Sequence, residues 1–492
     1  MSGVPGSAPE RTALSLRAAL AGLRARDPRR VREVAEPVPA EGPAGIFAAR
    51  CGGVPATSRD RAEDVMVFRR VLGHRYPVVF GLYGDERRVR DWLPGLPERA
   101  TPAAAARLTA AALPPVTVRD PECARVDIGR EGLGSLPVGR ITPRDAGSFL
   151  TTGLVLAEGT APDGDCALSV HRMLILDDRR LTLSMAPGRR LGELLSAALA
   201  AGRRLPVTVG LGVPPSAMIA SALGTRFLPS GTDKLAVAGA LAGAPLAVAG
   251  AVSQPVRVLA DSEIVVEGYL DGSTADESSA GPPDVSLPEF LGYDGAARAG
   301  LPVITVTAIT TRPDPFLHSV IGPGREQSVI LGLAGALSVA LGEPGEPLIR
   351  DLHFSPAGGG MLLLMVSVRK HGPACDGRLG PLARRIFAAH PFAKLIVFVD
   401  EDVDPAVAED VLWAVTTRAN LGTDAVTGTG SAPLSMDPSQ GPEWAAERGP
   451  GGIGRTWIDA TVPYRLRGRV RRSFPTLPGN PASSEVRSAG DP

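Results

Sequence analysis

The fold is decided by Glu263-Ile-Val-Val-Glu-Gly-Tyr-Leu270 and Pro302-Val-Ile-Thr-Val-Thr-Ala-Ile309, two runs in which β-branched residues dominate. Such runs are typical of strands, and the Pro and Gly residues between them indicate turns. The connecting segment contains Asp284 and Glu289, two carboxylates five positions apart. Because functional residues concentrate on loops held by rigid strands, this segment is predicted to contribute to a site.

The two runs belong to a predicted β-rich domain that extends from about residue 117 to 310. Short strand-like segments recur at spacings typical of a barrel or sandwich. These segments are residues 148–157, 168–176, 180–185 and 205–211, and helical stretches at 191–201 and 215–223 interrupt them.

The flanking regions predict two further domains, because 492 residues are too many for one core. Residues 11–116 are expected to form an α/β domain that begins with an amphipathic helix over 12–34. Residues 311–470 alternate between helical and strand-like segments, which predicts an α/β domain with a largely parallel sheet. The ends, 1–10 and 471–492, are predicted to be disordered tails.

Composition narrows the class of protein. Apolar residues make up 44% of the chain, charged residues 21%, and the formal net charge is zero. These values are typical of a globular protein and give no argument for nucleic acid or an acidic membrane as a partner. The four cysteines form no CxxC pair, so reduced thiols in a cytoplasmic protein are expected. The uncharged run from Leu235 to Val252 is rich in Ala and Gly and contains Pro245, which favours a buried helix followed by a strand over a membrane span.

Motifs with a fixed spacing do not identify a functional site in this sequence. The glycines at 210–212 and 322–324 lack the spacing of phosphate-binding loops, no GxSxG occurs, and the histidines show no HExxH pairing. What remains is the pair Asp284 and Glu289 together with Arg172. From the residues alone, an exposed ion pair is favoured over an active site for these three.

The same stretches resemble the UbiD family of decarboxylases. The resemblance rests on the two strand-like runs and on further segments in the family's order, over about residues 140–465. These further segments are Arg204-Leu-Pro-Val-Thr-Val-Gly-Leu-Gly-Val-Pro-Pro215, Pro288-Glu-Phe-Leu-Gly-Tyr293, Gly322-Pro-Gly-Arg-Glu-Gln-Ser328, Val399-Asp-Glu-Asp-Val-Asp404 and Ile458-Asp-Ala-Thr461. The resemblance implies an N-terminal α/β unit, a flavin-reductase-like split β-barrel and a C-terminal α/β domain. It also implies prenylated FMN as the cofactor of a reversible, non-oxidative decarboxylation of an α,β-unsaturated or (hetero)aromatic acid.

Carried over position by position, the family's catalytic groups fall on Arg172, Asp284 and Glu289. Asp284 is expected to pair with Arg172, and Glu289, which has apolar neighbours in the sequence, is expected to be the proton donor. His318 and Glu326 are expected to line the substrate pocket. Asp276 and Glu277, in a loop that looks longer than usual for the family, are expected to be solvated. The residues expected to bind the cofactor are Val170, His171, Arg172, Ser184, Met185, Ala186, Arg189, Arg190, Lys234 and Arg455.

The family's divalent metal has no counterpart among its expected ligands. The Asn, His and Glu positions fall on Ala167, Gly188 and Lys234, so metal binding is doubtful. Fixed cations are therefore expected to neutralise the cofactor phosphate. The alternative is a degenerate relative that binds flavin, or only assembles with partners, without turnover. The expected partners are a small carboxylic acid, a flavin prenyltransferase that supplies the cofactor, and further copies of the chain.

Overall fold

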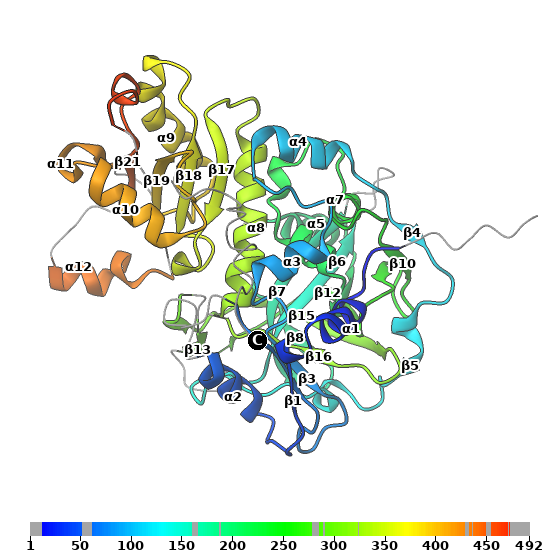
Figure 1. The fold of residues 1–492 in the computed structure, drawn as a ribbon. Coiled ribbons are helices and arrows are strands. Elements are labelled where there is room, and N and C mark those ends of the chain that lie inside the picture. The colour runs from blue at the N-terminus through cyan, green and yellow to red at the C-terminus, as the bar shows by residue number, and fades with distance from the viewer. Residues whose placement is uncertain are drawn as a thin grey trace, which may run out of the picture.

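The computed structural model describes residues 12–51, 62–159, 166–185, 188–277, 285–288, 291–322, 324–428, 432–434, 436–448, 454–470 and 472. The chain forms a closed barrel with helices around it, an N-terminal unit against one side, and a C-terminal unit on the other side of the long helix α8 (Arg325–Gly342). Figure 1 shows α8 running between the C-terminal sheet and the rest of the molecule. The domain boundaries stay predictions, although this arrangement follows the expected order of units.

The barrel has six strands, and every neighbouring pair is antiparallel. Its strands are β6 (Phe149–Glu158), β7 (Cys166–Asp177), β8 (Arg180–Thr182), β9 (Leu205–Leu211), β12 (Ile264–Ala275) and β15 (Leu301–Thr311). The ring is closed by β12 and β15, which pair from Ile264 with Thr311 to Ala275 with Leu301. These are the two runs that the sequence marked as strands, and their pairing leaves the barrel without an open edge.

The N-terminal unit has a four-stranded sheet in the order β1-β2-β3-β16, and its last strand comes from far along the chain. It consists of α1 (Leu16–Arg26), β1 (Val31–Val34), α2 (Gly42–Cys51), β2 (Val65–Phe68), β3 (Val78–Phe80), α3 (Glu86–Trp92), α4 (Pro102–Ala110) and β16 (Leu317–His318). The helix predicted over 12–34 is wrong in length. It ends at Arg26, because Pro28 disfavours helical backbone at Asp27 and residues 31–34 pair with β2 instead.

Helices and short strands cover the barrel. They are β4 (Val116–Thr117), β5 (Val126–Asp127), α5 (Arg190–Ala200), α6 (Pro215–Ala222), α7 (Lys234–Ala242), β10 (Ala247–Gly250), β11 (Arg257–Leu259), β13 (Val285–Pro288) and β14 (Asp294–Ala296). The uncharged run at 235–252 forms α7 and β10, as predicted. Among the described residues, no helix combines the length and apolar character needed to cross a bilayer.

The C-terminal unit is a five-stranded sheet with helices packed on it. Its elements are β17 (Ile349–Phe354), β18 (Leu363–Val368), α9 (Leu379–Ala389), β19 (Leu395–Asp400), α10 (Ala408–Arg418), α11 (Leu421–Asp424), β20 (Ala425–Gly428), α12 (Pro442–Arg448) and β21 (Arg455–Ala460). The strand order is β17-β18-β19-β21-β20. The three middle strands are parallel and the two outer ones antiparallel, so the predicted parallel character holds for the centre of the sheet.

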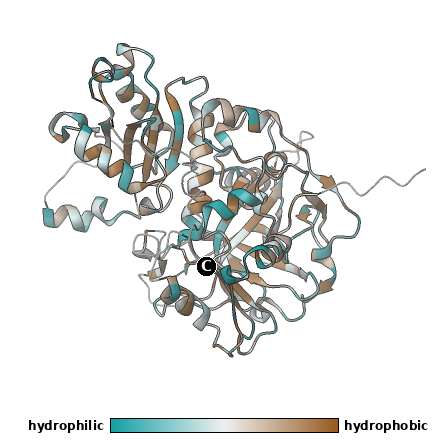
Figure 2. Ribbon diagram, viewed as in Figure 1, coloured by the Kyte–Doolittle hydropathy of each residue, from teal (hydrophilic) through white to brown (hydrophobic). Residues whose placement is uncertain are grey.

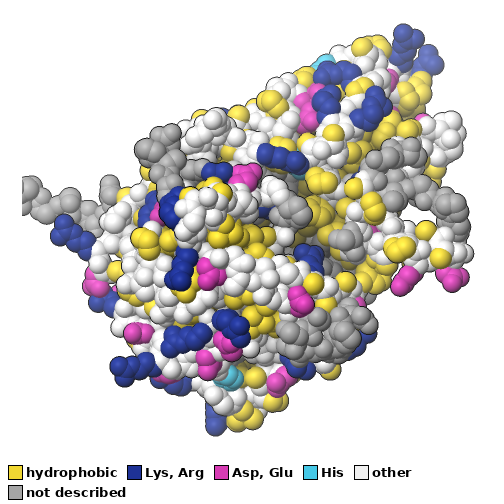
Figure 3. All heavy atoms as spheres, turned by 180° about the vertical axis from the view of Figure 1, so that it is seen from behind, with side chains coloured by type: hydrophobic (Ala, Val, Ile, Leu, Met, Phe, Trp, Pro, Cys, Tyr) yellow, Lys and Arg dark blue, Asp and Glu magenta, His cyan; other side chains and the backbone are white. Residues whose placement is uncertain are grey.

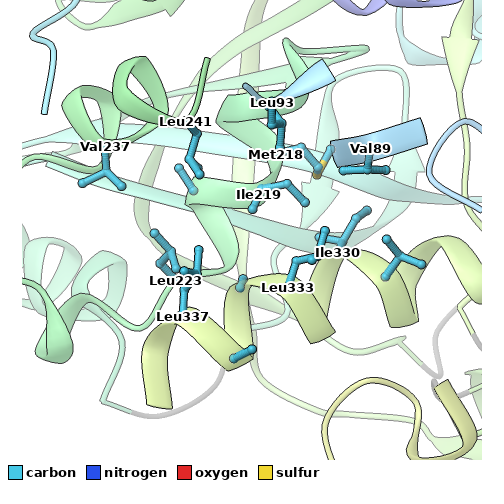
Figure 4. Packing of buried hydrophobic residues seen from close by; sticks show 14 of the residues in the cluster. Val89, Leu93, Met218, Ile219, Leu223, Val237, Leu241, Ile330, Leu333 and Leu337 are labelled. Atoms are coloured by element: carbon cyan, nitrogen blue, oxygen red, sulfur yellow. The ribbon is translucent and has the colours of Figure 1, made fainter. Parts of the chain in front are cut away.

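One apolar core joins all three units. Buried side chains form a continuous cluster from α1 through α3, α6, α7 and α8 to the C-terminal strand β19. Figure 4 shows Met218 and Ile219 of α6 between residues of α3, α7 and α8, and Figure 2 shows hydrophobic residues along the barrel and sheet strands. Burial of this size stabilises the chain mainly through the hydrophobic effect, and it fixes α6, α7 and α8 relative to the barrel.

Shortening a core side chain should measure how strongly this cluster contributes. Leu337 on α8 is 2% exposed, and we expect Leu337→Ala to lower the free energy of unfolding by about 2–5 kcal/mol, because it leaves a cavity. Leu412 on α10 is 60% exposed, so the same substitution there should change it by less than about 0.5 kcal/mol. Denaturant unfolding followed by circular dichroism compares the two; equal losses would contradict the packing described.

Candidate active site

A cavity of about 370 Å³ lies between the barrel, helices α6 to α8 and the C-terminal unit. Strand β7 forms one wall with residues 167–172, α8 a second wall, and residues of the C-terminal unit a third. Apolar side chains that line the cavity include Val170, Leu191, Met218, Ile330, Leu331, Met361, Phe392 and Met436. Seen from behind, apolar side chains gather along the junction between the C-terminal unit and the rest of the molecule (Figure 3).

An ion pair lies at the β7 wall. Arg172 Nη2 donates to Glu277 Oε2 at 3.2 Å, and the Glu277 side chain is completely buried. The same oxygen accepts from the backbone N–H of Arg298 at 3.2 Å. Arg298 in turn donates through Nη1 to Ser184 Oγ at 3.1 Å and also lines the cavity. Glu277 therefore holds two arginine-bearing segments together beside the cavity.

The expectation that Glu277 is solvated is wrong, and Arg298 was missed altogether. Strand β12 continues to Ala275, five residues beyond the predicted end, so the barrel ladder extends up to Glu277. Glu277 N–H also donates to Arg298 O at 2.9 Å, which continues the pairing of β12 with the segment before β15. The sequence Asp271-Gly-Ser is typical of a turn, and it obscured the continuation of the strand beyond Leu270.

The proposed acids Asp284 and Glu289 lie outside the described residues, as does Ala186. The pairing of Arg172 with Asp284 and the role of Glu289 therefore stay predictions. Leu287 and Pro288, the two residues before Glu289, do line the cavity, and β13 anchors them by pairing with β14.

His171 is held as a neutral imidazole. Its Nδ1 lies 2.9 Å from Ser184 O and its Nε2 lies 2.7 Å from Ser169 Oγ. Burial lowers the pKa of His171 to about 4, against a weaker opposing effect of the bond to Ser184. A neutral ring that donates to the carbonyl through Nδ1–H accepts from the Ser169 hydroxyl at Nε2. His171 therefore shapes the wall without adding charge. Of the other residues assigned to the cofactor, Val170 and Ser184 also line the cavity, and Met185 packs against the barrel core.

A cluster of cations lies at one side of the cavity. Lys234, at the start of α7, is 7% exposed, and its Nζ donates to Leu168 O at 3.1 Å and to Ser221 O at 2.9 Å. Arg189 and Arg190, before and at the start of α5, line the cavity close by. Arg190 Nη1 also pairs with Glu193 at 2.7 Å.

Arg455 is not among the residues that line the cavity. It is buried in the C-terminal unit, where Nη2 donates to Pro391 O at 2.8 Å and to Ala432 O at 3.2 Å. Its guanidinium, at the first residue of β21, is therefore committed to backbone carbonyls of the C-terminal unit.

His318 and Glu326 form a buried cluster with the N-terminal unit rather than part of the cavity wall. His318 Nε2 lies 3.3 Å from Glu326 Oε1, and both side chains are about as buried as the core. Glu326 accepts from Gly81 N at 2.6 Å and from Tyr83 N at 2.9 Å. The substrate-pocket role expected for them is not supported by this placement, because β16 places the His318 side chain against Tyr83.

The site fits a flavin phosphate and ring but not a divalent metal. In the described part of the chain, no three His, Cys, Asp or Glu side chains lie close enough to hold an ion. At the three positions implied by the resemblance, Ala167 and Gly188 offer no ligand atom and Lys234 offers a cation. A cationic side with apolar walls is, by contrast, what a phosphorylated aromatic cofactor requires.

Substitution of the buried Glu277 should destabilise the protein more than substitution of the exposed Asp276. Glu277→Gln removes the charge that faces Arg172, and we expect a loss of about 1–3 kcal/mol in the free energy of unfolding. Asp276 is exposed and its Oδ1 accepts from Gly300 N, a bond that Asn retains, so Asp276→Asn should change stability by less than about 0.5 kcal/mol. Thermal and denaturant unfolding of both variants provide the test, and a stable Glu277→Gln protein would contradict the ion pair.

Comparison with known proteins identifies the family. Residues 116–326 match the model of the 3-octaprenyl-4-hydroxybenzoate carboxy-lyase Rift-related domain, and residues 330–460 match that of the C-terminal domain. Gallate decarboxylase of Lactiplantibacillus plantarum is 30% identical over 341 residues, which are 68% of this chain and 69% of that protein. Anhydromevalonate phosphate decarboxylase of Aeropyrum pernix is 29% identical over 346 residues, 69% of this chain and 73% of that protein.

Solved structures agree in fold. The apo 3,4-dihydroxybenzoic acid decarboxylase of Klebsiella pneumoniae superposes with a TM-score of 0.85 at 30% identity and covers 96% of this chain and 99% of its own. An evolved dimeric form of the UbiD-class enzyme HmfF from Pelotomaculum thermopropionicum, in complex with prFMN, has a TM-score of 0.76 at 25% identity and covers 96% of this chain and 98% of its own. The matched models and relatives together show that the chain belongs to the UbiD family of carboxy-lyases.

Proposed function

We propose that the protein decarboxylates an α,β-unsaturated or (hetero)aromatic carboxylic acid, without net oxidation, in the cavity beside Arg172. The observation that carries this proposal is the Arg172–Glu277 pair, an oriented guanidinium at the wall of a largely apolar cavity. The relatives named for gallate and 3,4-dihydroxybenzoic acid support the aromatic class. Because a catalyst lowers the barrier in both directions, the same site can carry out carboxylation when CO₂ is in excess.

Prenylated FMN is the cofactor of this proposal, and the HmfF complex with prFMN supports it. When bound, this cofactor acts as an electron sink for the charge left as CO₂ departs. The residues proposed to hold it are those of β7 that line the cavity and Ser184 after β8, with Lys234, Arg189 and Arg190 at the phosphate. Supply by a flavin prenyltransferase, assembly into a homo-oligomer and a cytoplasmic location stay predictions.

Arg172 is proposed to bind the carboxylate of the substrate. Its side chain is only 15% exposed, so an incoming carboxylate meets it in a partly dry site where charge-assisted hydrogen bonds are strong. Glu277 supports this role by fixing the direction of the guanidinium and by compensating its charge before the substrate arrives. Apolar neighbours such as Val170 and Leu331 exclude water from the reacting carbon.

Glu289 is proposed as the proton donor. The observation that supports it is its place directly after Leu287 and Pro288, which line the cavity, and before Phe290 and Leu291 in the sequence. A carboxyl group that lies among apolar side chains stays protonated at higher pH and can give its proton to the carbon that has lost CO₂, which is the role proposed for Glu289. Asp284 is proposed to share Arg172 with Glu277.

A second candidate function is flavin binding without turnover. The observation that favours it is the missing set of metal ligands at Ala167, Gly188 and Lys234. Both candidates predict a flavin in the cavity, and they differ only in the conversion of substrate.

Co-expression with a flavin prenyltransferase decides between them. We expect the purified protein to contain a cofactor with the mass of prenylated FMN and to release CO₂ from at least one acid of a panel that includes gallate, 3,4-dihydroxybenzoate and five-membered heteroaromatic acids. Arg172→Ala should abolish the release. Cofactor of the right mass with no product from any acid would favour the binding protein.

Glu289→Gln tests the proton donor. The amide keeps the shape of the side chain but has no acidic proton, so turnover should fall by about 10²–10⁴-fold while the cofactor stays bound. Asp284→Asn should lower turnover less, because Glu277 still orients Arg172. Deuterium incorporation in D₂O, measured for both variants with the mature cofactor, shows which one has lost protonation; normal turnover of Glu289→Gln would show that another group donates.

A further inference from the structure

Lys234 is an isolated buried charge. Only three of the 52 basic residues in the chain are lysines, at 234, 370 and 394. Lys370 Nζ lies 2.6 Å from Asp376 and Lys394 Nζ lies 2.5 Å from Asp437. Lys234 pairs with no acidic side chain in the described part of the chain and donates only to the carbonyls of Leu168 and Ser221. Two of the three ammonium protons are therefore satisfied by neutral groups, and the charge itself is not compensated.

The surroundings of Lys234 make this charge costly. Burial, together with the positive charge of Arg189, lowers the pKa of Lys234 to about 7. The N-terminus of α7, where Lys234 is the first residue, also disfavours a cation. A buried ammonium that lines a cavity and has no counter-ion is suited to bind an anion that enters the cavity.

The other ionisable groups around Lys234 do not supply that counter-ion. His171 on β7 is neutral because its pKa is about 4, and burial raises the pKa of the Cys166 thiol above its ordinary value. The Asp233 carboxylate accepts from Cys166 Sγ at 2.9 Å and from the backbone N–H of Leu235 at 2.8 Å. Helix α6, which packs against α7, contains no ionisable side chain between Pro215 and Ala222.

We propose that Lys234 takes the place of a divalent metal in binding the flavin phosphate, and that phosphate binding adds a proton to Lys234. The proposal rests on the function proposed above only in placing a flavin in this cavity. The dianionic phosphate supplies the missing negative charge, Lys234 donates its third N–H to a phosphate oxygen, and Arg189 adds a second cation from the open side. A compact ammonium suits this position because it resembles a metal ion in size more than a planar guanidinium does.

The pH dependence of binding follows from linkage. In the free protein Lys234 loses its proton as pH rises through about 7, whereas the bound phosphate raises the pKa of Lys234 and keeps it charged. Below pH 7 both forms are protonated and this residue adds no pH dependence. Above pH 7 the affinity should fall by up to tenfold per pH unit, because each binding event must take up a proton.

FMN and riboflavin, titrated into the apo protein in EDTA, separate the phosphate from the ring. We expect Lys234→Met, which keeps the apolar stem, to weaken FMN binding by about 10–100-fold at pH 7 and to leave riboflavin binding unchanged. Lys394→Met, the same substitution in the C-terminal unit, should change neither. Inorganic phosphate should compete with FMN in the wild type. Equal loss of both flavins in Lys234→Met, or no loss of either, would overturn the proposal.

Calorimetry at pH 8 in buffers of different ionisation enthalpy measures the proton. The wild type should take up close to one proton per FMN, and Lys234→Met none. Lys234→Arg retains a charge that does not titrate, so it should bind FMN without proton uptake and with a flat pH profile. Added Mn²⁺ should leave the wild-type affinity unchanged. Absence of proton uptake in the wild type, or a requirement for Mn²⁺, would overturn the proposal even if the protein is an active decarboxylase. If proton uptake and Mn²⁺ independence are observed but no acid is decarboxylated, only the proposed function is overturned.

Discussion

The pairing of β12 with β15 is the constraint on which the site depends. It closes the barrel, and its last pairs carry the ladder beyond the ring to Glu277 and Arg298. Closure also brings β7 round to the same side, so that Arg172 meets Glu277 although the two lie 105 positions apart in the chain. A barrel left open at this seam would separate the acid from both arginines. The chemistry of the site is thus a consequence of how one sheet is completed.

A second buried acid connects the N-terminal unit to α8. Glu326, at the first turn of α8, accepts two backbone N–H groups from the loop after β3, near the positive end of the helix. These bonds fix the N-terminal unit to the helix that forms one wall of the cavity. His318 covers the same carboxylate from β16. Two acids of similar burial, Glu277 and Glu326, therefore differ in role because only one of them faces an arginine at the cavity.

Much of the fold could be predicted from local pattern. The strands at 205–211 and 301–311 and the helix α8 have strong β-branched or apolar runs with clear turn signals, and their positions were found within a few residues. The helix over 12–34 was predicted too long because its leucine spacing outweighed Pro28. Periodicity does not reveal where a segment pairs, so strand β16, only two residues long, had no signal at all.

The candidate site could be predicted only at positions that the family resemblance identifies. Arg172 and Lys234 were found through the resemblance, but burial of Glu277 depends on the register of β12 against β15, which no short window contains. Arg455 was placed at the phosphate because a lysine of the family falls on its position, whereas its guanidinium is taken up by carbonyls of its own unit. A motif match identifies the residue type at a position. The contacts of that side chain depend on strand pairing and packing in the folded protein.

Strand β16 has a consequence for the order in which the chain can mature on the ribosome. The N-terminal sheet is complete only when Leu317 and His318 pair with Val78 and Val79. During synthesis at about 5–20 residues per second, β3 waits on the order of tens of seconds for this strand to emerge. Throughout that interval the edge of β3 is unpaired and invites association with other nascent chains. The N-terminal sheet therefore completes its hydrogen bonding only after the last barrel strand has been made, and slower synthesis lengthens the time for which that edge is exposed.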